Sequence, residues 1–151
     1  MIVYFVLFIL ILLAIDIYIS ILRNRKRIRV FKEATLQSKK INKPLLVIGS
    51  PNSGFWNKNI MTGYGCGDLC TDLIGCDNCP HSIKGDLLDV LTTLKTNEYV
   101  IFESCVLEFI DKKRINEIKK QIQRVSGGDY YQVRIGSHIF PLEQPISQFG
   151  L

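Results

Sequence analysis

Residues 84–113, KGDLLDVLTTLKTNEYVIFESCVLEFIDKK, decide the fold. They open with Gly-Asp and an amphipathic stretch, and then reach the apolar run Tyr99–Phe102, which predicts a strand that passes into a short helix. Short apolar strands that alternate with polar or helical connections are typical of an α/β domain. We therefore expect an α/β fold with a mainly parallel sheet.

The flanking sequence extends this pattern in both directions. Upstream, residues 45–48 (LLVI) predict a buried strand and residues 69–73 a second short one. Downstream, residues 112–124 predict a helix whose apolar side chains recur at helical spacing, and VSGG ends it with glycine in the expected position. YYQVRIG, residues 130–136, predicts a further strand. The apolar stripe of that helix consists of Ile115, Ile118, Ile122 and Val125.

Candidate ligand-binding residues follow the first three predicted strands. The loop after residues 45–48 is rich in Gly, Ser, Pro and Asn, and Gly49 and Gly54 would let backbone N–H groups approach a ligand closely, although a plain turn reads the same way. Asp72 and Asp86 end the next two extended segments. Because ligands of an open parallel sheet bind at the carboxyl ends of its strands, these residues should converge on one crevice.

The N-terminal segment predicts a membrane anchor. Residues 2–22 carry one formal charge, Asp16, and a helix of that length crosses roughly 30 Å of hydrocarbon. Asp16 is either a snorkelling residue near the interface or a buried functional carboxylate. A cleaved signal peptide is the rival interpretation, but it needs a basic start and a small-residue cleavage site. The basic residues follow the span instead, which favours a cytoplasmic C-terminal domain: Arg23, Arg25, Lys26, Arg27 and Arg29.

The resulting organisation has three parts: a transmembrane helix (1–22), a basic juxtamembrane linker (23–42) and an α/β domain (43–151). Much of the net charge of +5 lies next to the membrane. It favours contact between residues 1–30 and anionic lipid head groups, and we expect no nucleic-acid partner.

The cysteine pattern leaves two interpretations open. Five cysteines, an odd number, stand in a domain expected to face a reducing compartment, which favours reduced thiols without metal. Thiolates with an imidazole are also zinc ligands, but one pair has a three-residue gap and little chain separates the two pairs. The clustered residues are Cys66, Cys70, Cys76, Cys79 and His81.

The segments LLVIGSPNSG, DLCTDLIG, KGDLLDVL and YVIFESCVLEFIDKKRINEIKKQIQRV together resemble the class I S-adenosylmethionine-dependent methyltransferases, over roughly residues 43–136. The resemblance implies a trimmed Rossmann-like sheet, with Asp72 on the ribose hydroxyls of S-adenosylmethionine and Asp86 on its adenine. It implies that the cofactor is held by Gly49, Ser50, Asn52, Gly54, Asp72, Asp86, Glu103 and Ser104.

Two departures from that family predict a degenerate, truncated member. Residues 48–54, IGSPNSG, lack the acid and the close glycine spacing of the family's first loop, and only about fifteen residues follow Ile135. The catalytic residues stay open. The resemblance implies that Glu103, Ser104 and Cys105 lie on the acceptor side, His138 or Glu143 could act as a base, and Phe55, Trp56 or Tyr64 could stack on a ring.

Three functions are therefore compatible with the sequence. The first is a membrane-anchored methyltransferase-like domain that binds S-adenosylmethionine. The second is a non-catalytic membrane or virion scaffold that uses the fold to contact protein partners. The third is a small zinc-binding membrane adaptor built around residues 66–81.

Overall fold

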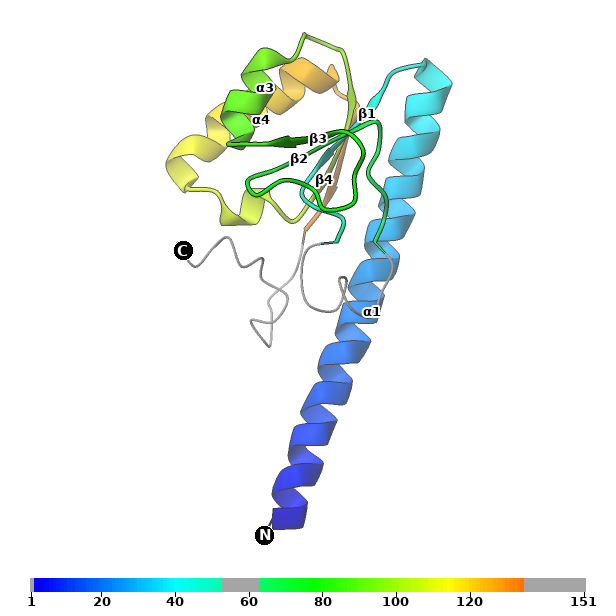
Figure 1. The fold of residues 1–151 in the computed structure, drawn as a ribbon, viewed down its shortest axis with the longest axis vertical. Helices are drawn as coiled ribbons and strands as arrows, with labels where there is room; N and C mark the ends of the chain where they lie inside the picture. Colours follow the sequence, from blue (N-terminus) through cyan, green and yellow to red (C-terminus); the bar gives the residue numbers. More distant parts are fainter. Residues whose placement is uncertain (1, 53–62, 135–151) are drawn as a thin grey trace.

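A five-stranded parallel sheet forms the centre of the domain in a computed structural model, which describes residues 2–52 and 63–134 (Figure 1). The strand order is β3-β2-β1-β4-β5, and all four neighbouring pairs are parallel. The expected parallel α/β sheet is thus confirmed. Its strands are β1 (Leu45–Ile48), β2 (Leu69–Asp72), β3 (Ser82–Lys84), β4 (Val100–Ser104) and β5 (Tyr130–Val133).

The strand register brings all carboxyl ends to one edge. Ile48 pairs with both Thr71 and Glu103, Asp72 pairs with Lys84, and Ser104 pairs with Val133. The order also places β2 on one side of β1 and β4 on the other, so the topological switch point of the sheet lies between β1 and β4.

Alternating side chains of β1 divide the core into two layers. Leu45 and Val47 face one cluster, which includes Phe102 and Ala34, whereas Leu46 and Ile48 face the other. All four β1 residues are buried, as a central parallel strand covered on both faces requires.

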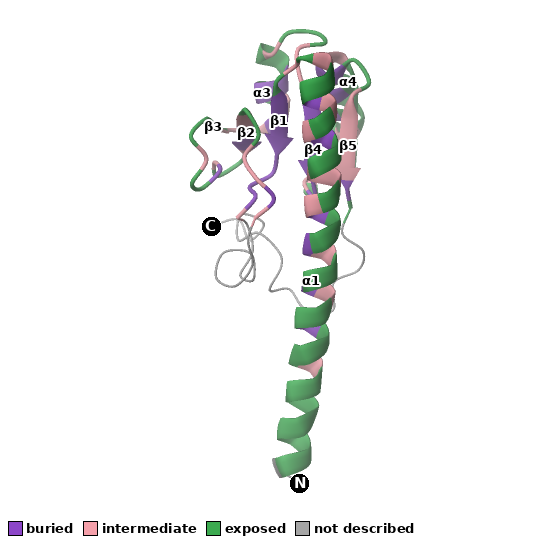
Figure 2. Ribbon diagram, turned by 90° about the vertical axis from the view of Figure 1, so that its right-hand side faces the viewer, coloured by how far each residue is buried: buried purple, intermediate pink, exposed green. Residues whose placement is uncertain are grey.

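The first cluster is covered by α1 (Ile2–Ile41), a single helix of 40 residues. Its N-terminal half exposes large apolar side chains from Val3 to Leu22, and its C-terminal half packs on the sheet (Figure 2). Residues 23–41, expected as a juxtamembrane linker, are therefore helical and supply one wall of the core. One face of the helix is buried at spacings of three, four and seven residues: Asp16, Ser20, Asn24, Arg27, Ala34 and Ser38.

The second cluster is covered by α3 (Leu87–Thr93) and α4 (Lys112–Ser126). Asp111 caps α4 through a hydrogen bond from the Lys113 N–H, at 3.0 Å, and Gly127 ends it with φ +63°. The predicted helix and its glycine stop are thus observed, because only glycine adopts a left-handed C-cap without strain. A 3₁₀ turn, η1 (Leu107–Phe109), follows β4 where the sequence predicted a short helix.

Candidate functional site

The carboxyl edge of the sheet carries most of the residues expected to bind a ligand. Gly49 follows β1, Asp72 ends β2, and Asp86 lies two residues past β3. Glu103 and Ser104 end β4. The backbone N–H of Gly85 donates to the Asp72 carbonyl at 3.2 Å, so the ends of β2 and β3 lie side by side.

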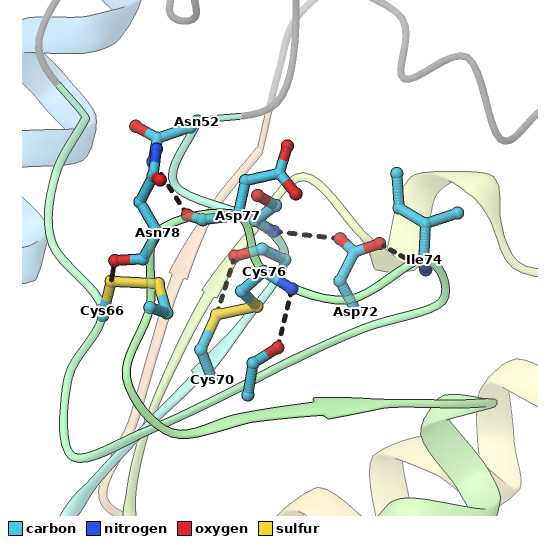
Figure 3. Close-up of a disulfide and its surroundings, with 12 residues drawn as sticks. Asn52, Cys66, Cys70, Asp72, Ile74, Cys76, Asp77 and Asn78 are labelled. Carbon is cyan, nitrogen blue, oxygen red and sulfur yellow. Dashed lines mark hydrogen bonds between the residues drawn. A yellow bond between two sulfur atoms is a disulfide. The ribbon is translucent and has the colours of Figure 1, made fainter.

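Asp72 lies against the turn that follows β1. Its Oδ2 accepts a hydrogen bond from the Ser50 N–H at 2.9 Å, and its Oδ1 accepts a longer one from the Ile74 N–H at 3.3 Å (Figure 3). A carboxylate offers about four acceptor positions, so two remain for a ligand. The side chain is half-buried at the edge. Asp72 therefore joins the loop after β1 to the end of β2, and its contact with a ribose stays a prediction.

Gly49 allows the loops after β1 and β4 to approach each other. Its φ is +99°, and a Cβ at this position would lie 2.7 Å from Val106 Cγ2 and 3.0 Å from the Ser104 carbonyl oxygen. The Gly49 carbonyl also accepts a hydrogen bond from the Tyr64 hydroxyl at 3.0 Å. The glycine is thus required by packing at the switch point, whatever ligand the edge binds.

Asp86 has partners of its own. Its Oδ1 accepts the Leu88 N–H at 2.9 Å and so caps α3, while both carboxylate oxygens accept hydrogen bonds from the Arg114 guanidinium, at 2.7 and 2.9 Å. This pairing holds the pKa of the Asp86 carboxyl below its usual value. The carboxylate is occupied by α4, and its contact with adenine stays a prediction.

Glu103 is fully buried rather than open to a ligand. Its Oε1 accepts the N–H groups of Val106 and Leu107, at 2.6 and 3.2 Å, and its Oε2 lies 3.1 Å from the Tyr130 hydroxyl. Burial raises the pKa of the carboxyl, against the effect of these hydrogen bonds. Glu103 therefore closes the turn after β4, and Ser104 beside it is also buried. Their role as cofactor ligands stays a prediction.

The loop after β1 is described only in part. Asn52 donates to the Asp77 carbonyl at 3.1 Å and so touches the loop between β2 and β3. Tyr64 is buried against Phe31 and Phe102, with ring centroids 5.9 and 5.0 Å away, so it belongs to the core. Gly54, Phe55, Trp56, His138 and Glu143 lie outside the described residues.

The clustered cysteines form two disulfides, Cys66–Cys79 and Cys70–Cys76, with Cα atoms 5.5 and 6.2 Å apart (Figure 3). The expectation of reduced thiols was wrong for these four residues. The odd number of cysteines favoured reduced thiols in the sequence analysis, but only the fifth cysteine, Cys105, is unpaired, and it is buried elsewhere. Sulfur atoms paired in disulfides are not thiolate ligands, and the described residues contain no group of three candidate metal ligands.

One buried polar contact at this edge was not anticipated. Arg27 of α1 donates from Nη2 to the Cys105 Sγ at 3.6 Å, and that thiol lies 3.4 Å from the Val133 carbonyl oxygen. The Arg27 Nε is buried without a hydrogen-bond partner among the described residues. Burial raises the pKa of the Cys105 thiol. The sequence had placed Arg27 with the membrane-proximal basic residues, but its spacing of three from Asn24 and four from Phe31 puts it on the buried helix face.

An open groove of about 570 Å³ lies at the opposite, amino edge of the sheet, between the end of α1 and the start of β1. It is lined by Phe31, Ser38, Lys43, Leu45 and Asp68, among others. None of the expected ligand-binding residues lines it. Strand topology favours the carboxyl edge for ligand binding, so we assign no ligand to this groove.

No family model, curated protein or solved structure matches the chain. The parallel α/β sheet therefore rests on the structure itself.

Proposed function

We propose that this chain binds a nucleoside cofactor of the S-adenosylmethionine type at the carboxyl edge of its sheet, as a membrane-anchored, degenerate methyltransferase-like domain. The observation that carries the proposal is the contact between Asp72 and the Ser50 N–H, 2.9 Å, next to the switch point of a β3-β2-β1-β4-β5 sheet. An acid at the end of β2, held against a glycine loop after β1, can accept hydrogen bonds from a ribose diol.

The residues fit the sugar end of such a cofactor better than its other ends. Asp72 has acceptor positions to spare at the end of β2. Asp86 is already paired with Arg114, and Glu103 is buried, so neither carboxylate is free for the adenine or the amino-acid group. When bound, the cofactor would supply a sulfonium methyl group, and the chain's residues would position it. This partial fit supports binding more strongly than catalysis.

A membrane location belongs to the same proposal. One helix of the described residues is long and apolar enough to cross a bilayer, and the basic residues that follow its apolar half favour a cytoplasmic domain. The two disulfides oppose that orientation, since disulfides persist mainly in oxidising compartments. Protease treatment of sealed vesicles distinguishes a cytoplasmic domain from a domain on the opposite side of the membrane. Digestion of residues 43–151 from the cytoplasmic side supports the proposal, and protection reverses the orientation.

The scaffold function remains the second candidate, because the carboxylates of Asp86 and Glu103 accept hydrogen bonds from groups within the domain. Under that function the edge needs no ligand, and the paired carboxylates serve only to hold α3, α4 and the turn after β4.

Calorimetry separates the two candidates. The full chain in lipid nanodiscs is titrated with S-adenosylmethionine and S-adenosylhomocysteine, where a micromolar Kd corresponds to about −8 kcal/mol. We expect Asp72→Ala to weaken binding by about 1.5–3 kcal/mol, because hydrogen bonds between the sugar and a charged acceptor are lost. The exposed Asp89 on α3 provides the matched control, and Asp89→Ala should bind normally. Absence of heat with the unaltered chain would favour the scaffold.

A further inference from the structure

We propose that the carboxyl edge of the sheet docks on the surface of the bilayer that holds α1, so that the candidate site opens onto the lipid head groups. The proposal concerns the orientation of the domain. It rests on the membrane insertion of α1 and not on cofactor binding.

The direction of the strands relative to α1 is the first step. Only residues 42–44 separate the end of α1 from β1, and the chain reverses there (Figure 1). Three side-chain contacts then mark successive positions from the end of α1 back toward its apolar half. Gln37 bonds Asp129 just before β5, at 3.0 Å; Phe31 packs on Phe102 within β4, at 5.4 Å between ring centroids. Arg27 reaches Cys105 just past β4. The strands therefore run toward the apolar end of the helix, and their carboxyl ends face the membrane.

The height of this edge above the apolar segment is the second step. Arg27, which marks the level of the carboxyl edge, follows Leu22 by five residues, or about 8 Å along a helix. The polar head-group layer on each side of a bilayer is about 5–8 Å thick. The edge thus lies at the level of the head groups when residues 2–22 occupy the hydrocarbon.

Exposed apolar side chains at the same edge are the third step, and they are independent of the first two. Outside α1, the large apolar side chains that the described residues leave exposed are Leu73, Ile74 and Phe109, at 57%, 57% and 37% exposure. Leu73 and Ile74 directly follow β2, and Phe109 lies in η1 after β4. Water contact with such side chains is unfavourable, whereas insertion at a lipid interface removes it.

The bilayer is the occupant that these observations favour over a protein. The three side chains lie at the carboxyl edge, toward which the apolar half of α1 extends, and nearby charges have both signs, with Glu108 and Asp111 beside Lys112 and Lys113. A purely electrostatic contact with anionic lipid is therefore not the basis of docking. Insertion of the apolar side chains of Leu73, Ile74 and Phe109 is instead the basis of docking.

Docking also assigns an acceptor class, and this step alone rests on the proposed function. An acceptor would be an amphiphile that presents a nucleophilic nitrogen or oxygen at head-group depth. The methyl carbon would pass from the sulfonium sulfur to that atom. The electrons of the broken C–S bond would stay on sulfur, giving S-adenosylhomocysteine, and the acceptor's proton would pass to water.

Quenching of tryptophan emission by bromine-labelled lipids tests the orientation. The full chain is reconstituted in nanodiscs with Trp56, its single tryptophan, changed by Trp56→Phe. Single tryptophans are then introduced by Ile74→Trp or Phe109→Trp at the carboxyl edge, and by Thr96→Trp, an exposed control before β4 at the amino edge. We expect strong loss of emission for the first two variants and little for the control. Equal quenching at both edges, or quenching at Thr96→Trp alone, overturns the proposal.

Two further measurements keep the result unambiguous. Circular dichroism shows whether each variant is folded, and Leu73→Ser in the Phe109→Trp background should reduce quenching if the tips insert together. Emission that changes with protein concentration and not with labelled lipid would mean contact between copies of the chain, which also overturns docking. Quenching at the carboxyl edge without cofactor binding in calorimetry would support docking and contradict only the methyltransferase-like function. Cofactor binding without quenching would contradict docking and support the methyltransferase-like function.

Discussion

At the scale of single residues, Gly49 fixes how closely the loops after β1 and β4 can approach. Its φ of +99° is strained for any other residue, and an added Cβ would collide with Val106 and with the Ser104 carbonyl. The collision involves backbone, which cannot move aside without disturbing β4. Glycine at this position is therefore a requirement of the fold as well as of the candidate site.

We expect Gly49→Ala to lower the free energy of unfolding by about 2–4 kcal/mol, as backbone strain and overpacking add together. Denaturant unfolding of the full chain in detergent measures the change. Gly85→Ala is the matched control, because its Cβ would lie 3.5 Å from Val90 Cγ2, an ordinary contact. An equal effect of the two variants would contradict the packing argument.

Glu103 gives the stability a pH dependence. Burial raises the pKa of its carboxyl above the ordinary value of 4.5, so the folded state holds the proton more tightly than the unfolded state. This contribution to stability is complete below pH 4.5 and is lost as the pH rises through the folded-state pKa.

Glu103→Gln should flatten this part of the pH profile, since an amide oxygen can still accept the N–H groups of Val106 and Leu107. The free energy of unfolding is measured from pH 4 upward for both proteins. Glu117→Gln, at an exposed position on α4, should leave the profile unchanged. A profile that Glu103→Gln does not alter would show that Glu103 titrates normally.

At the scale of elements, α1 has two roles within one helix. Its apolar half suits a bilayer, and its second half covers one face of the sheet through Phe31, Ala34 and Ile41. The domain expected from the sequence, 43–151, omits this cover. It would expose Val47 and Phe102 to water.

We therefore expect a fragment of residues 24–151 to unfold cooperatively and a fragment of residues 43–151 to be destabilised by about 3 kcal/mol or more, through lost apolar burial. Thermal unfolding followed by circular dichroism compares them. Identical transitions would mean that the helix is only a tether.

The loop between β2 and β3 is held by its two disulfides, which close segments separated by 13 and 6 positions. Alkylation of the denatured chain without reductant should modify Cys105 alone, and Cys105→Ser should abolish that signal. Five modifications without reductant would show that the other four cysteines are thiols. Reduction should lower stability by about 2–3 kcal/mol for each disulfide, as expected for such short loops.

Sequence patterns were sufficient where one local signal controls the structure. The apolar run at residues 45–48 became β1, and the glycine after VS ended α4. They were insufficient where partners are distant in sequence. Arg27 finds Cys105 and Asp86 finds Arg114 only through the fold, and Glu103 is buried by the turn that it caps. The two disulfides could not be predicted either, because the fold determines which four of the five cysteines come together.

At the scale of the whole molecule, the direction of the strands determines which edge of the sheet lies nearer the apolar half of α1. The strands run toward the apolar end of α1 (Figure 1). The contact between Arg27 and Cys105 places the carboxyl edge at the level of Arg27, and the proposed docking would turn this edge toward the bilayer. In that orientation a ligand of this edge would enter between the bilayer and the sheet. The amino edge of the sheet, near Thr96 and Asn97, lies at the opposite end of the strands.

Hydrogen exchange of the full chain in nanodiscs, with and without S-adenosylmethionine, tests the central claim that the carboxyl edge binds this cofactor. Backbone N–H groups exchange more slowly where a ligand orders or covers them. We expect added protection at residues 48–52 and 70–76, lost on Asp72→Ala, and no change at residues 94–99. Protection confined to the amino edge, or none anywhere at saturating cofactor, would contradict it.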